Sequence, residues 1–243
     1  MIDIKNLSFE YEKGVTVLDS INIHINKGEK VGIIGANGAG KSTLLKILVG
    51  LIDNYTGDVR VLGLDVRRKN YPKIREDVSY MFQDSDNQLF MPTARDDIQF
   101  ALKNRKITEE KIRAMTENAA ACAGCEHLLE KSVWKMSGGE KKLVCIATML
   151  ATEPKIMLLD EPTNSLDPIN RKNIIGIIKR LDSTVLIASH DLDMILNTCD
   201  RVILINSGKI AEEGSTQKIL TDKELLFKNN LLLPLSLTKI SEP

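Results

Sequence analysis

The sequence predicts an α/β protein built on a mixed or parallel sheet, and two observations carry this prediction. The apolar run 31–34 is followed by a glycine-rich turn, and from Lys41 onward apolar residues recur at helical spacing. Two later strand candidates, 156–159 and 184–188, flank a helical stretch at about 168–181. A strand, a helix and a second strand in this order form the βαβ unit of a parallel sheet.

Two further segments have different patterns. Apolar and polar residues alternate within residues 2–11 and 21–25, which predicts half-buried strands and an N-terminal antiparallel β-subdomain. From about residue 94 to 151 the sequence has the pattern of successive helices without a convincing strand, so we expect a helical subdomain inserted into the core. The main domain is expected to span residues 1–220.

Residues 221–243 are expected to form a C-terminal tail, after two short helices that begin beyond Gly214. The tail is rich in leucine, but Asn229, Asn230 and Pro234 interrupt it, so it is not one long helix. Its leucines are expected to be buried against this chain or against a partner, because exposed apolar surface favours association.

The composition is that of a folded domain without a strong charge. The chain has 243 residues with 33 Lys and Arg against 33 Asp and Glu, a formal net charge of +0. Such a chain has no basic field for nucleic acid or anionic lipid. Its longest apolar runs are far shorter than the roughly 18 residues of a membrane span, and its first residues lack the pattern of a secretory signal. We therefore expect a cytosolic chain that does not bind nucleic acid.

The four cysteines are expected to be free thiols, since a reducing cytosol disfavours disulfides. Cys122 and Cys125 form one C-x-x-C with His127 close behind, but a closed zinc site needs four ligands and no second pair is nearby in sequence. We favour small apolar side chains at the end of an Ala-rich helix over a metal or redox site. Cys145 and Cys199 are expected in the core.

The strongest motif is Gly-Ala-Asn-Gly-Ala-Gly-Lys-Ser at residues 35–42, here called the phosphate loop, which matches G-x-x-x-x-G-K-[ST]. Its glycines let backbone N–H groups and a helix N-terminus converge on one anion, and Lys41 adds a positive charge for the β- and γ-phosphates. Its place between a buried strand and a helix favours a P-loop NTPase core over an ordinary glycine turn. The residues expected to bind nucleotide here are Gly35, Asn37, Gly38, Ala39, Gly40, Lys41, Ser42 and Thr43.

A pair of carboxylates, Asp160 and Glu161, ends the apolar strand 156–159. At the carboxyl end of a parallel sheet such side chains emerge beside a phosphate loop, where Asp160 can hold a metal ion through water and Glu161 can reach a hydrolytic water. Ser42 would add a hydroxyl ligand to Mg²⁺. Alone, the pair also fits a solvated strand end, and the phosphate loop favours the chemical interpretation.

Further motifs follow in an order that carries a family resemblance. Ser-Gly-Gly-Glu at 137–140 opens a helix upstream of the acidic strand, Gln83 follows a strand, Asp167 follows the acidic pair, and His190 follows the next strand. Over roughly residues 1–220 this pattern resembles ATP-binding-cassette (ABC) ATPases. Residues 82–90 also resemble the segment around the family glutamine in energy-coupling-factor ATPases, which act in cobalt, nickel and vitamin uptake.

The resemblance implies that two cassettes, identical or different, enclose two ATP molecules head to tail. Ser137, Gly138 and Gly139 would then bind the partner's ATP, as the positive end of a helix allows. Asp167 would cross the dimer interface. Tyr11 stands where the family has an aromatic residue that stacks on adenine, with a tyrosine packed on the strand surface as the alternative.

The resemblance also implies the catalytic roles. Glu161 would polarise the attacking water, and His190 would bridge that water and the γ-phosphate, whereas an isolated histidine would be a surface residue by default. Gln83 would contact Mg²⁺ and sense the membrane partner. The expected cofactors are ATP and Mg²⁺, with Ser42, Gln83 and Asp160 as metal ligands.

The segment 136–140, here called the signature segment, departs from the family pattern. Met136 replaces a usual leucine with little change in volume, and Leu143 stands where arginine is common. Glu140 replaces a usual glutamine and adds a negative charge to the first helical turn, which would weaken phosphate binding if it pointed inward. We therefore expect slower turnover, or a differing partner cassette that performs part of the work.

The sequence thus predicts the ATPase subunit of a membrane importer of the energy-coupling-factor type, for cobalt, nickel or a vitamin. Its expected partners are a second cassette and an integral membrane subunit, and its expected place is the cytoplasmic face of the cell membrane. A soluble ABC switch in a non-transport complex is the alternative, although one set of motifs and no sustained heptads disfavour it. A small-molecule kinase gives no reason for the signature segment.

Overall fold

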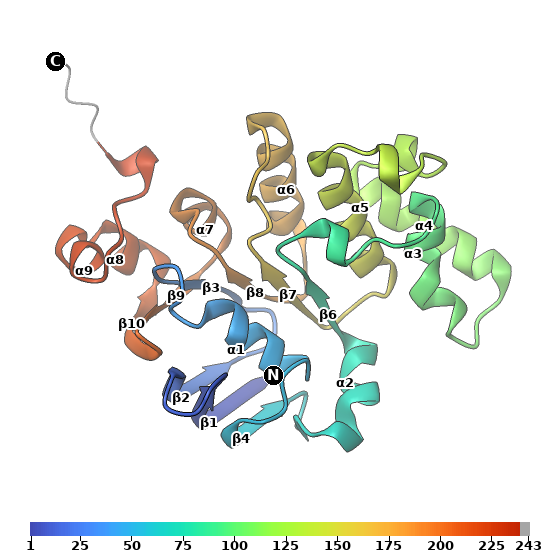
Figure 1. Ribbon diagram of the computed structural model, residues 1–243. Coiled ribbons are helices and arrows are strands. Elements are labelled where there is room, and N and C mark those ends of the chain that lie inside the picture. The colour runs from blue at the N-terminus through green and yellow to red at the C-terminus, as the bar shows by residue number, and fades with distance from the viewer. Residues whose placement is uncertain (239–243) are drawn as a thin grey trace, which may run out of the picture. The chain divides into compact units, whose positions relative to one another are not determined.

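The computed structural model describes residues 1–238, which divide into two compact units (Figure 1). Unit 1 joins residues 1–75 to the segment from 182 onward, and unit 2 comprises residues 76–181. The boundary lies within helix α2 (Tyr71–Asp77). One unit is therefore made of two distant chain segments, and the other is continuous in sequence.

Unit 1 contains an antiparallel sheet, as the alternating pattern of the first 25 residues predicts. In β1 (Ile2–Glu10), Ile4 pairs with Ile23 of β2 (Thr16–Ile25) and with Val59 of β4 (Thr56–Val61). The order is β2-β1-β4-β5, with β5 at Leu64–Asp65. The predicted N-terminal antiparallel β-subdomain is confirmed, and β4 and β5 add to it two strands that the sequence interpretation did not name.

The mixed sheet of unit 1 is centred on β3 (Lys30–Ile34), which runs parallel to β8 (Thr184–Ala188) and to β9 (Arg201–Asn206). Antiparallel β10 (Lys209–Ser215) pairs with β9. Residues Val31, Ile33 and Ile34 are fully buried, so the apolar run is a strand covered on both faces. The predicted mixed or parallel sheet is confirmed here.

Short helices complete unit 1. The helix α1 (Lys41–Leu48) buries Leu44, Leu45 and Ile47, the periodic residues that predicted it. The two short helices expected after Gly214 are present as α8 and α9. The other helical segments of this unit are η1 (Arg68–Asn70), α7 (Leu192–Thr198), α8 (Thr216–Thr221), α9 (Lys223–Lys228) and η5 (Leu235–Leu237).

The leucines of the tail divide between two environments. Leu226 is fully buried within the chain, whereas Leu232 and Leu235 are 76% and 84% exposed. Of the two burial modes expected for the tail, packing against this chain therefore holds for Leu226 and not for the other two. Residues 239–243 of the predicted tail lie outside the described residues.

Unit 2 pairs two parallel strands with the predicted helical segment. β6 (Val78–Met81) runs parallel to β7 (Ile156–Asp160). Residues 94–151 contain helices and, among the described residues, no strand of two or more residues, although Ser132 within the segment forms one isolated bridge with Thr93 just before it. The helical segments are η2 (Ser85–Asn87), α3 (Ala94–Lys103), α4 (Glu109–Ala123), η3 (Glu126–Leu128), η4 (Val133–Lys135), α5 (Gly138–Ala151) and α6 (Pro168–Arg180).

Helix ends in unit 2 follow ordinary capping chemistry. Thr108 caps α4 by accepting a hydrogen bond from the Lys111 N–H, and Gly124 ends that helix in the left-handed conformation at φ 69°. The predicted helix at 168–181 begins at Pro168 and ends at Arg180. The helical character of these segments is thus confirmed, and the proposed domain boundaries stay a prediction.

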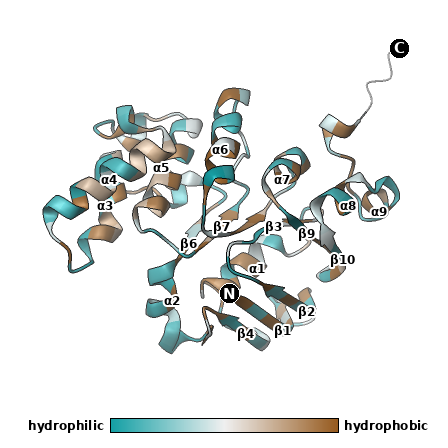
Figure 2. Ribbon diagram, turned by 180° about the vertical axis from the view of Figure 1, so that it is seen from behind, coloured by the Kyte–Doolittle hydropathy of each residue, from teal (hydrophilic) through white to brown (hydrophobic). Residues whose placement is uncertain are grey.

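Apolar residues concentrate in the strands, and β1, β3 and β9 carry hydrophobic stretches in Figure 2. Within residues 1–238, no helix has the length and apolar character needed to cross a bilayer. Three of the cysteines, Cys125, Cys145 and Cys199, are buried free thiols, and burial raises the pKa of each to about 12. Cys122 is exposed, which supports the apolar interpretation of the C-x-x-C only for its second cysteine.

Candidate active site

The phosphate loop connects β3 to α1 in unit 1, as the sequence predicts. Gly35 and Gly40 are required here by close packing: a Cβ on Gly35 would lie 2.1 Å from the Ile205 carbonyl oxygen, and one on Gly40 would lie 2.7 Å from Leu18 Cδ2. Gly40 also has φ 102° as the N-cap of α1. The turn therefore brings its backbone against the sheet and points the N-terminus of α1 at the loop.

Lys41 is the first residue of α1 and is only 7% exposed. Its Nζ donates hydrogen bonds to the carbonyl oxygens of Gly35, at 2.8 Å, and Ala36, at 3.0 Å. The ammonium group is thus held inside the loop, where the positive end of the helix dipole adds to its charge. This arrangement suits a phosphate group.

Tyr11 lies immediately after β1 and is 58% exposed. Its hydroxyl group is 3.2 Å from Thr43 Oγ1, and its ring packs edge-on against Phe9 with 4.7 Å between ring centroids. The tyrosine therefore lies next to the first turn of α1 with much of its side chain open to solvent. This location is compatible with both alternatives for Tyr11, a ring that stacks on adenine and a ring packed on the strand surface.

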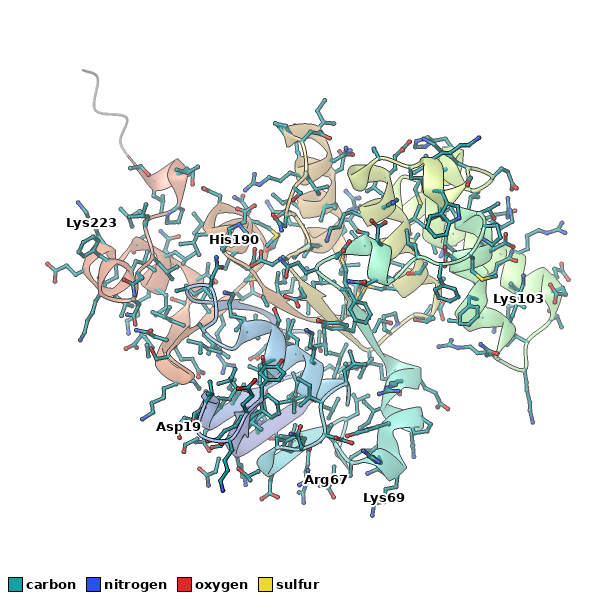
Figure 3. The ribbon with its side chains drawn as sticks, in the orientation of Figure 1. Asp19, Arg67, Lys69, Lys103, His190 and Lys223 are labelled. Atoms are coloured by element: carbon teal, nitrogen blue, oxygen red, sulfur yellow. The ribbon has the colours of Figure 1, made fainter. Side chains whose placement is uncertain are left out.

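His190 follows β8, which lies directly beside β3 because Ala188 pairs with Ile33. The Ser189 N–H extends this pairing to the Ile33 carbonyl oxygen at 3.2 Å. The imidazole of His190 is exposed beyond the strand (Figure 3). The carboxyl ends of β3 and β8 thus place the phosphate loop and His190 at the same edge of one sheet, within unit 1.

The acidic pair lies at the carboxyl end of β7, in unit 2. Asp160 ends β7 and is 2% exposed, and Glu161 is 6% exposed with φ 48°, an unusual backbone conformation for a residue with a side chain. The Tyr80 hydroxyl donates to Asp160 Oδ2 at 2.9 Å. Gln83 follows β6, whose Met81 pairs with the residue before Asp160. The structure therefore brings Gln83, Asp160 and Glu161 together at the carboxyl ends of the parallel strands β6 and β7.

The segment after Gln83 is anchored to α5. Gln88 donates through Nε2 to the Cys145 carbonyl oxygen at 3.2 Å and to Thr148 Oγ1 at 3.1 Å, and it accepts from the Phe82 N–H at 3.3 Å. Helix α5, which begins in the signature segment and is here called the signature helix, is thus directly hydrogen-bonded to the segment that carries Gln83. Movement of one is expected to move the other.

The signature segment starts α5 with a capping box. Ser137 Oγ accepts from the Glu140 N–H at 3.3 Å, and Glu140 Oε2 accepts from the Ser137 N–H at 2.7 Å. Lys131 Nζ donates to both carboxylate oxygens of Glu140, at 2.7 and 2.8 Å. The Lys131 hydrogen bonds, followed by the bond from Ser137, lower the pKa of Glu140. The carboxylate is therefore turned to its own helix end and neutralised by Lys131.

Asp167 caps α6 and is linked to the signature helix by Asn170. Asp167 accepts from the N–H groups of Ile169 and Asn170 at 2.9 and 3.0 Å, and Asn170 Nδ2 donates to it at 2.5 Å. These hydrogen bonds lower the pKa of Asp167. A Cβ on Gly139 would lie 2.4 Å from Asn170 Nδ2. The Asn170 side chain thus packs directly over Gly139, and the motif patterns did not single Asn170 out.

Lys142 is a second residue that sequence reasoning missed. It lies one turn into α5 and is 4% exposed, next to Lys141, whose ammonium pairs with Asp86 at 2.5 Å. Two adjacent lysines in a helix are usually both solvated. Only the burial of α5 distinguishes them, so the sequence alone carried no indication of it.

Comparison with known proteins decides the family. The sequence profile of the ABC transporter family matches residues 18–164. A putative ABC transporter ATP-binding protein of Geobacter sulfurreducens is 40% identical over 98% of this chain and 95% of its own length. The chain belongs to the ABC transporter ATP-binding family. As an ABC protein, it is an ATPase whose hydrolysis is coupled to transport, and it binds ATP.

Other relatives of this ABC protein include an energy-coupling factor transporter ATP-binding protein of Clostridium perfringens, 37% identical over 96% of this chain and 84% of its own length. CbiO1 of Clostridium perfringens, part of the ABC transporter complex CbiONQ, matches with a TM-score of 0.83 and 36% identity over 94% of each chain. The dimeric ATP-binding cassette MJ0796 bound to ADP and Pi matches with a TM-score of 0.82 and 28% identity over 89% of this chain and 99% of its own. The predicted P-loop ABC fold is confirmed.

Proposed function

We propose that this ABC protein is the ATPase subunit of an energy-coupling-factor importer at the cytoplasmic face of the cell membrane. The observation that carries the proposal is the full-length similarity to CbiO1, a part of the CbiONQ transporter complex, with the energy-coupling factor ATP-binding relative in support. The cargo would be cobalt, nickel or a vitamin, and a membrane subunit would bind it.

The working form would be a dimer of cassettes, identical or different, docked on an integral membrane subunit. The dimeric cassette bound to ADP and Pi supports this part of the proposal. The phosphate loop of each cassette would hold ATP, with Tyr11 at the adenine. Ser137, Gly138 and Gly139 of the opposite cassette would close on the γ-phosphate, and Asp167 would lie at the interface between the two.

Mg²⁺ fits the donor set of this chain. Its predicted ligands, Ser42, Gln83 and Asp160, offer hydroxyl, amide and carboxylate oxygen atoms, which hard divalent cations prefer. A bound Mg²⁺ would supply charge neutralisation at the phosphates, and Tyr80 would orient the Asp160 carboxylate through its hydroxyl group.

The chain's own residues would then perform hydrolysis in a few positioning steps. Lys41 and the N-terminus of α1 hold the β- and γ-phosphates, and Glu161 orients and polarises a water for in-line attack. His190 holds that water and the γ-phosphate in register. Gln83 relays the state of the site to the membrane subunit.

The Glu161→Gln variant tests the assignment of the base. It should bind ATP and lose steady-state hydrolysis by about 100-fold or more, because the amide cannot accept a proton from water. ATP should trap it as a dimer in size-exclusion chromatography. The control is Glu117→Gln, an exposed position on α4, which should hydrolyse ATP at the wild-type rate. Undiminished phosphate release by Glu161→Gln would remove Glu161 from this role.

Copurification tests the transport assignment. Native protein extracted in mild detergent should carry a multispanning membrane protein, and its ATPase rate should change when that partner is present. Cosedimentation with ribosomes or nucleic acid, without a membrane partner, would instead support a soluble switch.

A further inference from the structure

Lys142 joins three segments of unit 2 through one buried ammonium group. It projects from α5, and its Nζ donates to the Gln83 carbonyl oxygen at 2.6 Å and, more weakly, to the Glu161 carbonyl oxygen at 3.4 Å. Gln83 follows β6 and Glu161 follows β7, so the two acceptors belong to the residues proposed to sense the partner and to polarise water. A single side chain of the signature helix thus contacts the backbone of both.

Burying this ammonium is unfavourable, and the chain tolerates it at a 4% exposed position. Burial lowers the pKa of Lys142, while the charges of Asp160, Asp84 and Glu161 favour its protonated form. A methionine of similar length would fill the same space without the desolvation cost. What the lysine adds over an apolar side chain of this length is therefore the set of contacts that its nitrogen atom makes.

The contact with Glu161 occurs where the backbone is strained. Glu161 has φ 48°, and a residue with a side chain holds that conformation only when its surroundings impose it. The Lys142 hydrogen bond to its carbonyl oxygen, at 3.4 Å, contributes to holding the peptide that follows Glu161. The direction of the Glu161 carboxylate depends on this backbone, so loss of the bond would change where the carboxylate points.

We propose that Lys142 is a positioning residue that ties the signature helix to the backbones of Gln83 and Glu161. A shift of α5, such as closure on a partner's nucleotide would cause, then moves the carboxylate and the glutamine together. This inference rests on the proposed function of Glu161 and Gln83. It assigns Lys142 no contact with ATP or with water.

The test is Lys142→Met, with Lys142→Arg as the variant that keeps a donor and Lys155→Met as the control. Lys155 pairs with Asp77 at an exposed position of the same unit, so its loss removes a lysine without touching the motifs. Lys142→Met should bind ATP within about twofold of wild type, because the phosphate loop is unchanged, and should lose about 10- to 100-fold in kcat. Lys142→Arg should recover at least part of kcat, and Lys155→Met should match wild type.

A purely structural lysine gives another pattern. It would lower the melting temperature while leaving kcat per folded molecule within about twofold of wild type in both Lys142→Met and Lys142→Arg. That result overturns the proposal. If Lys142→Met does not fold, Lys142→Gln, which keeps an N–H donor, is measured in the same way. Because glutamine keeps a donor, Lys142→Ala is measured beside it. A wild-type kcat in both folded variants would also overturn the proposal.

The Glu161→Gln variant separates this inference from the proposed function. If Glu161→Gln still hydrolyses ATP, the proposed function of Glu161 fails whatever Lys142 does. If Glu161→Gln is inactive and folded Lys142→Met retains the wild-type kcat, only the role of Lys142 fails. The expected outcome is an inactive Glu161→Gln and a Lys142→Met whose kcat is reduced about 10- to 100-fold, both with ATP binding intact.

Discussion

The phosphate loop and the signature segment each form a helix N-terminus, but the first carries a lysine ammonium and the second a glutamate carboxylate. Each is glycine-rich and each begins a helix, α1 in unit 1 and α5 in unit 2. At the phosphate loop the N-cap is Gly40, which has no side chain, and a lysine ammonium lies inside the turn. At the signature segment Ser137 and Glu140 cap each other, and Lys131 lies behind the carboxylate.

The difference shows how each helix start treats an anion. The phosphate loop offers positive charge to an external phosphate, whereas the signature segment already contains an anion, Glu140, which satisfies the Ser137 N–H. At the signature segment, the carboxylate therefore already compensates part of the positive potential of the helix N-terminus, which weakens its attraction for a phosphate. We infer that the first site sets affinity for ATP and that the second adds a smaller contribution, sensitive to the Lys131–Glu140 pair.

The largest expected effect comes from breaking the phosphate loop. Lys41→Ala removes the ammonium that lies against Gly35 and Ala36, and ATP affinity should fall by about 100-fold, the scale of a lost charged hydrogen-bonding group. Titration with a fluorescent ATP analogue measures it. Lys46→Ala, in the last turn of the same helix, is the control and should bind normally. An unchanged affinity in Lys41→Ala would show that the loop does not hold the phosphates.

A smaller effect is expected at the signature segment. Lys131→Met leaves the Glu140 charge unbalanced, and ATP-dependent dimerisation of the Glu161→Gln protein should weaken about two- to fivefold, as for partly exposed ion pairs. Glu140→Gln should bind at least as well as wild type, and adding it to Lys131→Met should restore dimerisation. Analytical ultracentrifugation gives the dissociation constants. A loss in Lys131→Met that Glu140→Gln does not repair would separate the lysine's role from the charge of Glu140.

The smallest effect is a titration. The pKa of Glu140 is lowered from 4.5 by Lys131 and Ser137, so the capping box contributes stability above that pH and loses it as the pH falls through the folded-state pKa. Carboxyl ¹³C shifts should give Glu140 a midpoint below 4.5, and Lys131→Met should raise it. The phosphate loop has no carboxylate in its cap and should show no matching transition. A midpoint at or above 4.5 in the wild-type protein would contradict the pairing.

The sequence predicted most of the fold because its local patterns agree with the final structure. The alternation in residues 2–11, the apolar run at 31–34 and the helical spacing after Lys41 all correspond to observed elements. The same holds for the motif residues, since each is placed by the strand or helix next to it. Glu161 follows β7 and His190 follows β8, so the direction of each strand determines the end at which its residue lies.

Contacts between distant segments were not predictable in this way. Glu140 could point toward or away from a phosphate, and only the fold brings Lys131 to it from a loop that precedes the helix. Lys142 looks like Lys141 in sequence, and only packing of α5 against the strand ends buries one and not the other. Asn170 approaches Gly139 because two helices meet, which no periodicity records.

The position of β3 between β8 and β9 has a consequence for how the chain is made. β3 is complete by Ile34, but both of its neighbours come from the segment that begins at residue 184. During synthesis this largely apolar strand stays unpaired at both edges until more than half of the chain has left the ribosome. Unit 2 is continuous and is finished earlier. Unit 1 is thus the later of the two units to be completed.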